Sequence, residues 1–249
     1  MKLTTREWGK GPRVAVLLHG LTGSSETWGG VAERLNQQGY RCIAPDLRGH
    51  GESPKPARGY RLADFVADLA QTLPAEPELL IGHSFGGLVA LCAATSAALR
   101  PGRMVLEDPM VVHHTAERGD HIFRTMYEVQ FRMLEQDSLL PVLQSAAPRL
   151  STEALERQLR ARRLVSEGAV RQILVENEID ALELVKRLKT RTLFVLADPS
   201  ILIPPQAAIG IEQLLGPGSV VTIPHTSHQV HGDDLDGFMG AVEAFLKGA

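Results

Sequence analysis

The sequence is poor in cysteine and aromatic residues and has no excess of basic charge. Its two cysteines, Cys42 and Cys92, lack the spacing of a metal site or a disulfide framework, so we expect both to be small buried apolar residues. Aromatic residues make up 5% of the chain, which does not indicate a stacking platform. The formal net charge is −3 and no long run of like charge occurs, so nucleic acid is not an expected partner. The sequence implies no metal and no organic cofactor.

An export signal and a membrane span are also absent from the expected features. The first eight residues, MKLTTREW, carry charges where a secretory signal needs an apolar stretch, so we expect a cytoplasmic location. Residues 79–99 are apolar enough to resemble a membrane span, but the glycine-rich run 82–87 interrupts them. A buried strand followed by a buried helix explains this stretch better, and no membrane partner is expected.

The pattern of the chain is that of an α/β protein with a mostly parallel central sheet and helices on both faces. With 249 residues and 44% hydrophobic content, the chain can bury one sizeable core. Short apolar runs alternate with helical patterns almost throughout. The expected strands are 3–8, 14–18, 41–44, 78–81, 104–107, 192–197 and 220–223, and the expected helices are 27–38, 62–73, 86–98, 205–214 and 233–246.

The interval 110–188 breaks this alternation, because it contains charged amphipathic segments and no strand candidate. We interpret it as a helical lid inserted between two parts of one α/β core, residues 1–109 and 189–249. Open parallel sheets bind ligands at the carboxyl ends of their strands, so a lid there would shape the substrate pocket. The alternative is an extra helical layer without a role in binding. His113 and His114, at its start, are either substrate-facing or solvated loop residues.

The run GHSFGG at residues 82–87 matches G-x-S-x-G and lies between an apolar strand and a helical pattern. A strand that turns directly into a helix leaves room only for small residues beside Ser84, and the strained turn exposes the serine hydroxyl. A hydroxyl at a helix N-terminus is placed for nucleophilic attack, and the backbone N–H of Phe85 is aimed at the oxygen of the attacked group. The alternative is a glycine-rich buried turn with an incidental serine.

Two further segments could complete a serine-nucleophile site. The strand 14–18 runs into the glycine-containing loop 19–23, where the backbone N–H of Leu21 can act as a second oxyanion donor; the alternative is an ordinary strand-to-helix loop. Three histidines, His225, His228 and His231, follow the last expected strand. A base there would lie at the same sheet edge as Ser84, and a base after the serine is one of the known triad orders.

Together these motifs resemble the lid-containing α/β-hydrolase family from about residue 14 to residue 245, except in the lid. The matching pieces are His19-Gly20, PDLRGHGES at 45–53, GHSFGG at 82–87, and Ser227-His228. In the family the base precedes the final helix and commonly follows a small residue, which selects His228. The resemblance implies that His225 and His231 are pocket-rim or surface residues, and that the run 46–53 is a structural turn without a catalytic role.

The sequence departs from the family pattern at the triad acid. Most relatives place an aspartate four residues before a proline after the strand matching 192–197, and aligning on Pro204 puts Ser200 at that position. A minority of the family takes the acid from the end of the preceding strand, where this chain has Glu107 and Asp108. We favour Asp108, with Asp198 as its main rival and Glu107 after them.

The predicted function is that of a serine hydrolase, similar to esterases and lactonases of this family. A serine in place of an aspartate at the turn argues against the carboxylate-nucleophile chemistry of haloalkane dehalogenases and epoxide hydrolases. We expect cleavage of a small-molecule carboxylic ester, thioester or lactone through an acyl-enzyme. The alternatives are carbon–carbon bond hydrolysis, elimination or cyclisation by the same residues, or a non-catalytic small-molecule receptor. Turnover of activated esters separates the enzyme from the receptor.

Overall fold

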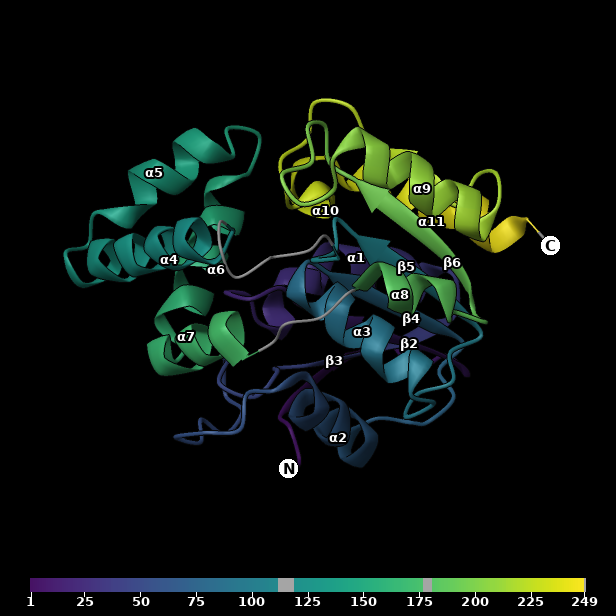
Figure 1. The fold of residues 1–249 in the computed structure, drawn as a ribbon, viewed down its shortest axis with the longest axis horizontal. Helices are drawn as coiled ribbons and strands as arrows, with labels where there is room; N and C mark the ends of the chain where they lie inside the picture. The colour runs from purple at the N-terminus through teal and green to yellow at the C-terminus, as the bar shows by residue number, and fades with distance from the viewer. Residues whose placement is uncertain (112–118, 177–180, 249) are drawn as a thin grey trace.

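A computed structural model gives the fold of the chain and describes residues 1–111, 119–176 and 181–248 (Figure 1). Its centre is a seven-stranded sheet with the strand order β1-β3-β2-β4-β5-β6-β7. Only β1 runs antiparallel to its neighbour; every other pairing is parallel. All seven predicted strands are confirmed, as β1 (Thr5–Trp8), β2 (Arg13–Leu18), β3 (Tyr40–Pro45), β4 (Leu79–His83), β5 (Arg103–Glu107), β6 (Arg191–Leu196) and β7 (Val220–Thr222).

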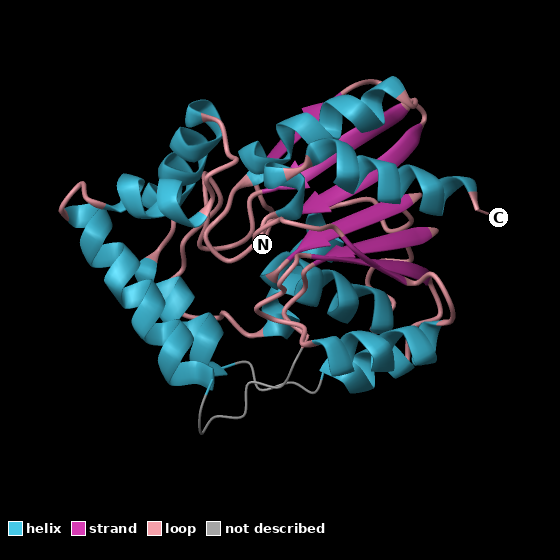
Figure 2. Ribbon diagram, turned by 90° about the horizontal axis from the view of Figure 1, so that it is seen from above, coloured by secondary structure: helices cyan, strands magenta, loops and turns pink. Residues whose placement is uncertain are grey.

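Helices cover both faces of the sheet, which explains why its inner strands, such as β2, β4 and β5, are apolar on both sides (Figure 2). Val16 and Leu18 of β2 pack in a cluster with the helices α2 (Leu62–Thr72), α3 (Phe85–Thr95), α8 (Ala181–Lys186) and α9 (Pro205–Leu215). Ala15 and Leu17 face the opposite way, toward η1 (Ser25–Trp28), α1 (Gly29–Gln37) and α11 (Leu235–Lys247). The prediction of an α/β fold with a mostly parallel sheet is therefore confirmed. No helix in the described ranges is long and apolar enough to cross a membrane.

The two cysteines are buried on opposite faces of the sheet, as predicted. Cys42 belongs to the cluster around α1 and Cys92 to the cluster around α3, and both thiols are free. Burial disfavours the charged thiolate and raises the pKa of each to about 12. Both residues therefore act as small apolar side chains.

The described part of the segment between β5 and β6 consists of helices joined by short loops and contains no strand. Its helices are α4 (Gly119–Glu135), α5 (Leu139–Ala146), α6 (Thr152–Arg163), α7 (Glu167–Glu176) and α8, and α4–α7 lie as a group beside the sheet (Figures 1 and 2). Helices α5 and α6 and the loop between them share a separate apolar cluster, formed by Leu139, Leu143, Leu150 and Leu155. The last helix, α8, instead packs on the core cluster around α3. His113 and His114 lie outside the described residues.

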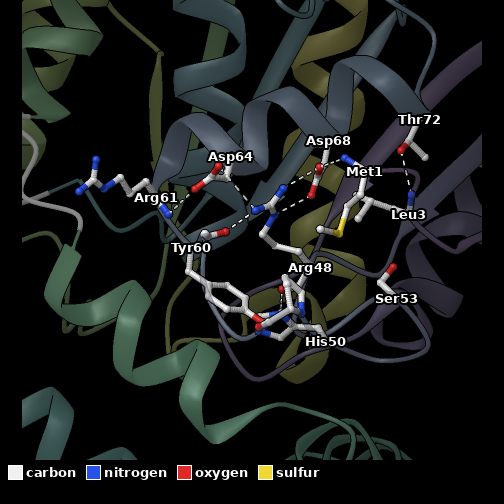
Figure 3. Close-up of polar contacts among 12 residues, drawn as sticks. Met1, Leu3, Arg48, His50, Ser53, Tyr60, Arg61, Asp64, Asp68 and Thr72 are labelled. Atoms are coloured by element: carbon white, nitrogen blue, oxygen red, sulfur yellow. Dashed lines mark hydrogen bonds and ion pairs between the residues drawn. The ribbon is translucent and has the colours of Figure 1, made fainter.

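The loop after β3 is held by a buried ion pair (Figure 3). Arg48 donates from Nε and Nη2 to the two carboxylate oxygens of Asp68 on α2, both at 2.7 Å, and both side chains are buried. Asp46, at the start of the same loop, accepts the backbone N–H groups of Ser25 at 2.7 Å and Glu52 at 2.9 Å. Asp46 fixes backbone and Arg48 is paired with Asp68, so these contacts support the interpretation of this run as a structural turn.

Candidate active site

The turn between β4 and α3 forces Ser84 into a strained backbone conformation, with φ 53° and ψ −119°. A positive φ is costly for a side chain with a Cβ and persists only where the surrounding structure imposes it. The neighbouring glycines show how tight the turn is. A Cβ on Gly82 would lie 2.6 Å from the carbonyl oxygen of Gly86, and one on Gly86 would lie 2.4 Å from that of Leu18. Only small residues allow the chain to turn here and present the Ser84 hydroxyl.

A continuous hydrogen-bonded chain links Ser84, His228 and Asp108. His228 lies in the loop between β7 and α10 (Val230–Asp233), and its Nε2 is 2.8 Å from Ser84 Oγ. Its Nδ1 lies 2.6 Å from Asp108 Oδ2. Asp108 directly follows β5 and is fully buried, whereas the side chain of His228 is 30% exposed. The structure thus brings together the three residues that the sequence analysis favoured as nucleophile, base and acid.

The other oxygen of Asp108 is held by Ser200. Ser200 Oγ donates to Asp108 Oδ1 at 2.5 Å and accepts the backbone N–H groups of Leu202 at 3.2 Å and Ile203 at 2.9 Å. Because both lone pairs of the hydroxyl face N–H donors, its proton is directed at Asp108. Ser200, which aligns with the usual acid position of the family pattern, therefore holds the carboxylate of Asp108, the candidate acid. No pattern in the sequence predicts this contact, although aligning on Pro204 places Ser200 at this position.

The rival carboxylate, Asp198, lies elsewhere in the site. Its side chain is exposed at the wall of the cavity described below, and among the described residues it makes no hydrogen bond with His228. Asp108 is thus the candidate acid that contacts the imidazole.

Two backbone N–H groups beside Ser84 are without a hydrogen-bond partner among the described residues. They belong to Phe85, the first residue of α3, and to Leu21 in the loop after β2, and both residues are buried. The first N–H groups of a helix have no partner within the helix and favour negative charge. The Leu21 loop is fixed by His19, whose Nε2 accepts the N–H of Leu47 at 2.9 Å. Burial lowers the pKa of His19 to about 3, so the ring is neutral and can accept this bond.

A cavity of about 680 Å³ opens in front of Ser84. It is lined by the Leu21 loop, by Ser84 and His228, and by residues of α4 and α6, so it lies between the sheet edge and the helices that follow β5. This volume is in the range of small-molecule sites, roughly 300–1,000 Å³. In the described part of the chain, no group of three or more His, Cys, Asp or Glu side chains is arranged to bind a metal ion.

A family model described as alpha/beta hydrolase fold matches residues 14–235. The chain belongs to the α/β-hydrolase family. It is 28% identical over 257 residues to the sn-1-specific diacylglycerol lipase ABHD11 of Mus musculus, covering 93% of this chain and 80% of the lipase. It is 27% identical over 246 residues to the N-formylmaleamate deformylase of Pseudomonas putida, covering 97% of this chain and 91% of the deformylase. Because these relatives are hydrolases, the chain is an enzyme of the α/β-hydrolase class.

The solved structures agree with this family. The esterase EaEST of Exiguobacterium antarcticum superposes with a TM-score of 0.79 at 19% identity, covering 98% of this chain and 95% of the esterase. At this identity the similarity shows the fold.

A second histidine–carboxylate pair lies behind the Ser84 site of this hydrolase. His231 Nδ1 is 2.6 Å from Glu107 Oε2, and the His231 backbone N–H donates to Glu107 Oε1 at 2.8 Å. Burial raises the pKa of Glu107, but the charge and hydrogen bonds of His231, with the charge of His83, outweigh it and lower the pKa below its usual value. The His231 ring stacks on Trp28, with centroids 4.5 Å apart.

The prediction that His231 is a rim or surface residue was wrong. The short helix α10 turns the chain back from the cavity, so His231 is buried against Glu107. His225 is exposed and lines the cavity, in agreement with a place at the pocket rim. Glu107 is engaged with His231 rather than with His228.

Proposed function

We propose that this α/β hydrolase is a serine hydrolase that cleaves a carboxylic ester, thioester or lactone of a small molecule through an acyl-enzyme. The observation that carries the proposal is the hydrogen-bonded chain Ser84–His228–Asp108 at the wall of a cavity of small-molecule size. The serine, the imidazole and the carboxylate stand in the order that nucleophilic catalysis requires.

In the first step, His228 Nε2 accepts the proton of Ser84 as Oγ attacks the substrate carbonyl carbon. The carbonyl oxygen becomes an oxyanion and accepts hydrogen bonds from the free N–H groups of Leu21 and Phe85. Asp108 accepts the Nδ1–H of His228 and stabilises the imidazolium that forms. One donor of this kind contributes on the order of 10²–10³-fold to the rate.

In the following steps, the imidazolium gives its proton to the leaving alcohol or thiol, and the acyl group remains on Ser84 Oγ. Water, deprotonated by His228, then attacks the acyl carbon and releases the acid and the free serine. We assign the segment 110–188 the role of a lid, because its helices α4 and α6 contribute Tyr127, Gln130 and Gln158 to the cavity. A wall above the serine excludes water and shapes the substrate that is accepted.

The relatives' names support hydrolysis of an acyl bond. One is a diacylglycerol lipase and another a deformylase, and both match nearly the whole of this chain. A serine, a histidine base and a pair of oxyanion donors serve acyl transfer in general, so the Ser84 site is compatible with this class of reaction.

The test combines covalent labelling with turnover. Wild type, Ser84→Ala and the control Ser145→Ala, which changes an exposed serine on α5, are treated with a fluorophosphonate and assayed with 4-nitrophenyl esters. We expect wild type and Ser145→Ala to be labelled on Ser84, located by peptide mass spectrometry, and to hydrolyse the esters. Ser84→Ala should do neither. Folded wild-type protein that is neither labelled nor active would overturn the proposal in favour of a receptor.

A further inference from the structure

Arg162 is a cation within the wall of the substrate cavity. It lies in the last turn of α6, one helical turn after Gln158, and both side chains line the cavity that contains Ser84. Gln158 in turn donates a hydrogen bond from Nε2 to Gln229, the residue after His228. The face of α6 that carries Arg162 is therefore tied directly to the loop of the proposed base.

Among the described residues, the Arg162 guanidinium is partnered only by neutral oxygens at long distances. Its Nε donates to Gln130 Oε1 at 3.4 Å, and its Nη1 donates to the backbone oxygen and to Oε1 of Gln158 at 3.3 and 3.2 Å. Its Nη2 makes no hydrogen bond with any described residue. A guanidinium presents five N–H donors in a planar fork, so several of them remain available to a ligand.

The other arginines of α6 differ from Arg162 in having carboxylate partners. Arg157, Arg160 and Arg163 each lie within 4.0 Å of an Asp or Glu side chain. No carboxylate of the described residues lies at ion-pair distance from Arg162. The one arginine of this helix that lines the cavity is thus the one without a counter-ion among the described residues.

Arg162 is half-buried, and this partial burial makes the cation costly when the cavity holds no anion. Burial lowers the pKa of Arg162 to about 10, a shift that the nearby Tyr127 partly opposes, so the side chain is still charged at neutral pH. A charge removed from water without a counter-ion is destabilising, and a ligand carrying that counter-ion regains the lost interaction.

The other charged groups of the cavity wall leave Arg162 available. Arg149 and Asp198 are exposed, so solvent screens their charge. Asp233 accepts the backbone N–H of Ser227 in the loop before His228. None of the three is among the ion-pair partners of Arg162.

We propose that Arg162 binds a carboxylate of the substrate, so that the enzyme acts on small esters, thioesters or lactones that carry a second, ionised carboxyl group. The inference rests on the proposed function, because it assigns a role within the same cavity. The planar fork matches the two oxygens of a carboxylate. A single cation balances one negative charge. A phosphate group carries about 1.5 to 2 negative charges at neutral pH, so a carboxylate is the better match for Arg162.

The first test measures kcat/KM for two matched ester pairs. In one pair the carboxylate is in the acyl part, as in 4-nitrophenyl hydrogen adipate, and its partner is the methyl ester. In the other pair the carboxylate is in the leaving group, as in 3-carboxyphenyl butyrate, and the partner is again the corresponding methyl ester. In at least one pair, we expect the wild type to have a higher kcat/KM for the carboxylate-bearing ester than for its methyl ester. Arg162→Gln should lower this ratio roughly 10- to 100-fold. Turnover of the methyl esters should fall less in Arg162→Gln than turnover of the matching acids, because the methyl esters make no charged contact.

Two further variants make the comparison specific. Arg157→Gln removes the same charge from the same helix, but outside the cavity, and should keep the wild-type preference. Arg162→Lys keeps the charge but lacks the planar fork, so it should retain part of the preference for the carboxylate substrate. Equal losses in Arg157→Gln and Arg162→Gln would overturn the proposal, because they would reflect the general field of α6. So would a wild type that prefers the methyl ester in both pairs.

A binding measurement separates this inference from the proposed chemistry. Adipate is titrated calorimetrically into wild type, Arg162→Gln and Arg157→Gln. If no ester is hydrolysed and Ser84 is not labelled, the proposed function fails, and the titration alone decides the carboxylate site. Binding to wild type and Arg157→Gln that is weakened at least tenfold in Arg162→Gln supports the site. Equal binding, or none, in all three proteins overturns it.

Discussion

Replacing Asp108 with asparagine removes the negative charge beside His228 and nearly preserves the shape of the side chain. In the wild type, one carboxylate oxygen accepts from His228 Nδ1 at 2.6 Å and the other accepts from Ser200 Oγ at 2.5 Å. Asparagine offers one acceptor and one donor at these two places. The effect of the substitution therefore depends on which atom faces the imidazole.

The contacts of Ser200 decide that orientation. The Ser200 hydroxyl already accepts two backbone N–H groups, so it can only donate toward residue 108. The amide oxygen of asparagine must face it, which turns the amide NH₂ toward His228. A donor at this place forces the proton of the imidazole onto Nε2, and Nε2 can then no longer accept the proton of Ser84.

The expected loss is large, because both the tautomer and the charge are wrong for catalysis. Substitution of this kind in a serine triad lowers kcat about 10⁴-fold, and we expect a loss of about 10³–10⁴-fold in kcat/KM for Asp108→Asn. The rate of fluorophosphonate labelling should fall in parallel. Thermal unfolding should show that the variant is folded, which separates loss of catalysis from loss of structure.

The matched control is Asp198→Asn, which changes the exposed carboxylate on the cavity wall. We expect its kcat/KM to stay within about threefold of wild type, since a solvated carboxylate without a contact to His228 contributes little. The reasoning is refuted if Asp198→Asn loses activity as Asp108→Asn is expected to, or if folded Asp108→Asn keeps more than a tenth of the wild-type rate.

Two further predictions concern stability. Gly86→Ala places a methyl group 2.4 Å from the carbonyl oxygen of Leu18, so it should destabilise the fold by about 1–3 kcal/mol and abolish fluorophosphonate labelling. The control Gly240→Ala, which has open space around it, should do neither. Thermal unfolding measures the stability of the two variants. Burial lowers the pKa of His83 to about 4, so between about pH 6.5 and 4 the unfolded chain binds a proton that the folded protein does not. The free energy of unfolding should therefore decrease as the pH is lowered across that window. Measured by urea unfolding, its slope against pH should be smaller by up to about 1.4 kcal/mol per pH unit in His83→Gln, but not in His225→Gln, which changes an exposed histidine. An unchanged slope in His83→Gln would contradict this assignment.

The strands and the turn at Ser84 could be predicted because their determinants are local. Strand β2 is apolar at successive positions, since both of its faces are buried, and this is visible in four or five residues of sequence. The turn needs Gly82 and Gly86 because backbone atoms approach them within 3 Å. Such steric demands leave a mark on the residue types, so the position of Ser84 followed from the motif.

The carboxylate that contacts His228 and the burial of His231 had no comparable local mark. Three carboxylates stood near the required sheet edge, and the sequence could rank them only by resemblance. The structure brings Asp108 to His228 and Glu107 to His231, although the two carboxylates are neighbours in the chain. Adjacent side chains at a strand end point in different directions, and only the fold of the β7–α10 loop decides which histidine meets which carboxylate.

The sequence alone therefore determined the α/β fold and the place of Ser84 in the strand-to-helix turn, and the resemblance singled out His228 as the candidate base. Tertiary structure decided the contacts made by side chains that lie far apart in the chain, including His228 with Ser84, 144 residues away, and Ser200 with Asp108, 92 residues away. It also decided that Arg162 lines the cavity with no counter-ion in the part of the chain that the structure describes. The physical reason is that periodicity and glycine spacing report on backbone geometry over one or two turns, whereas a hydrogen bond between distant side chains depends on how whole elements pack.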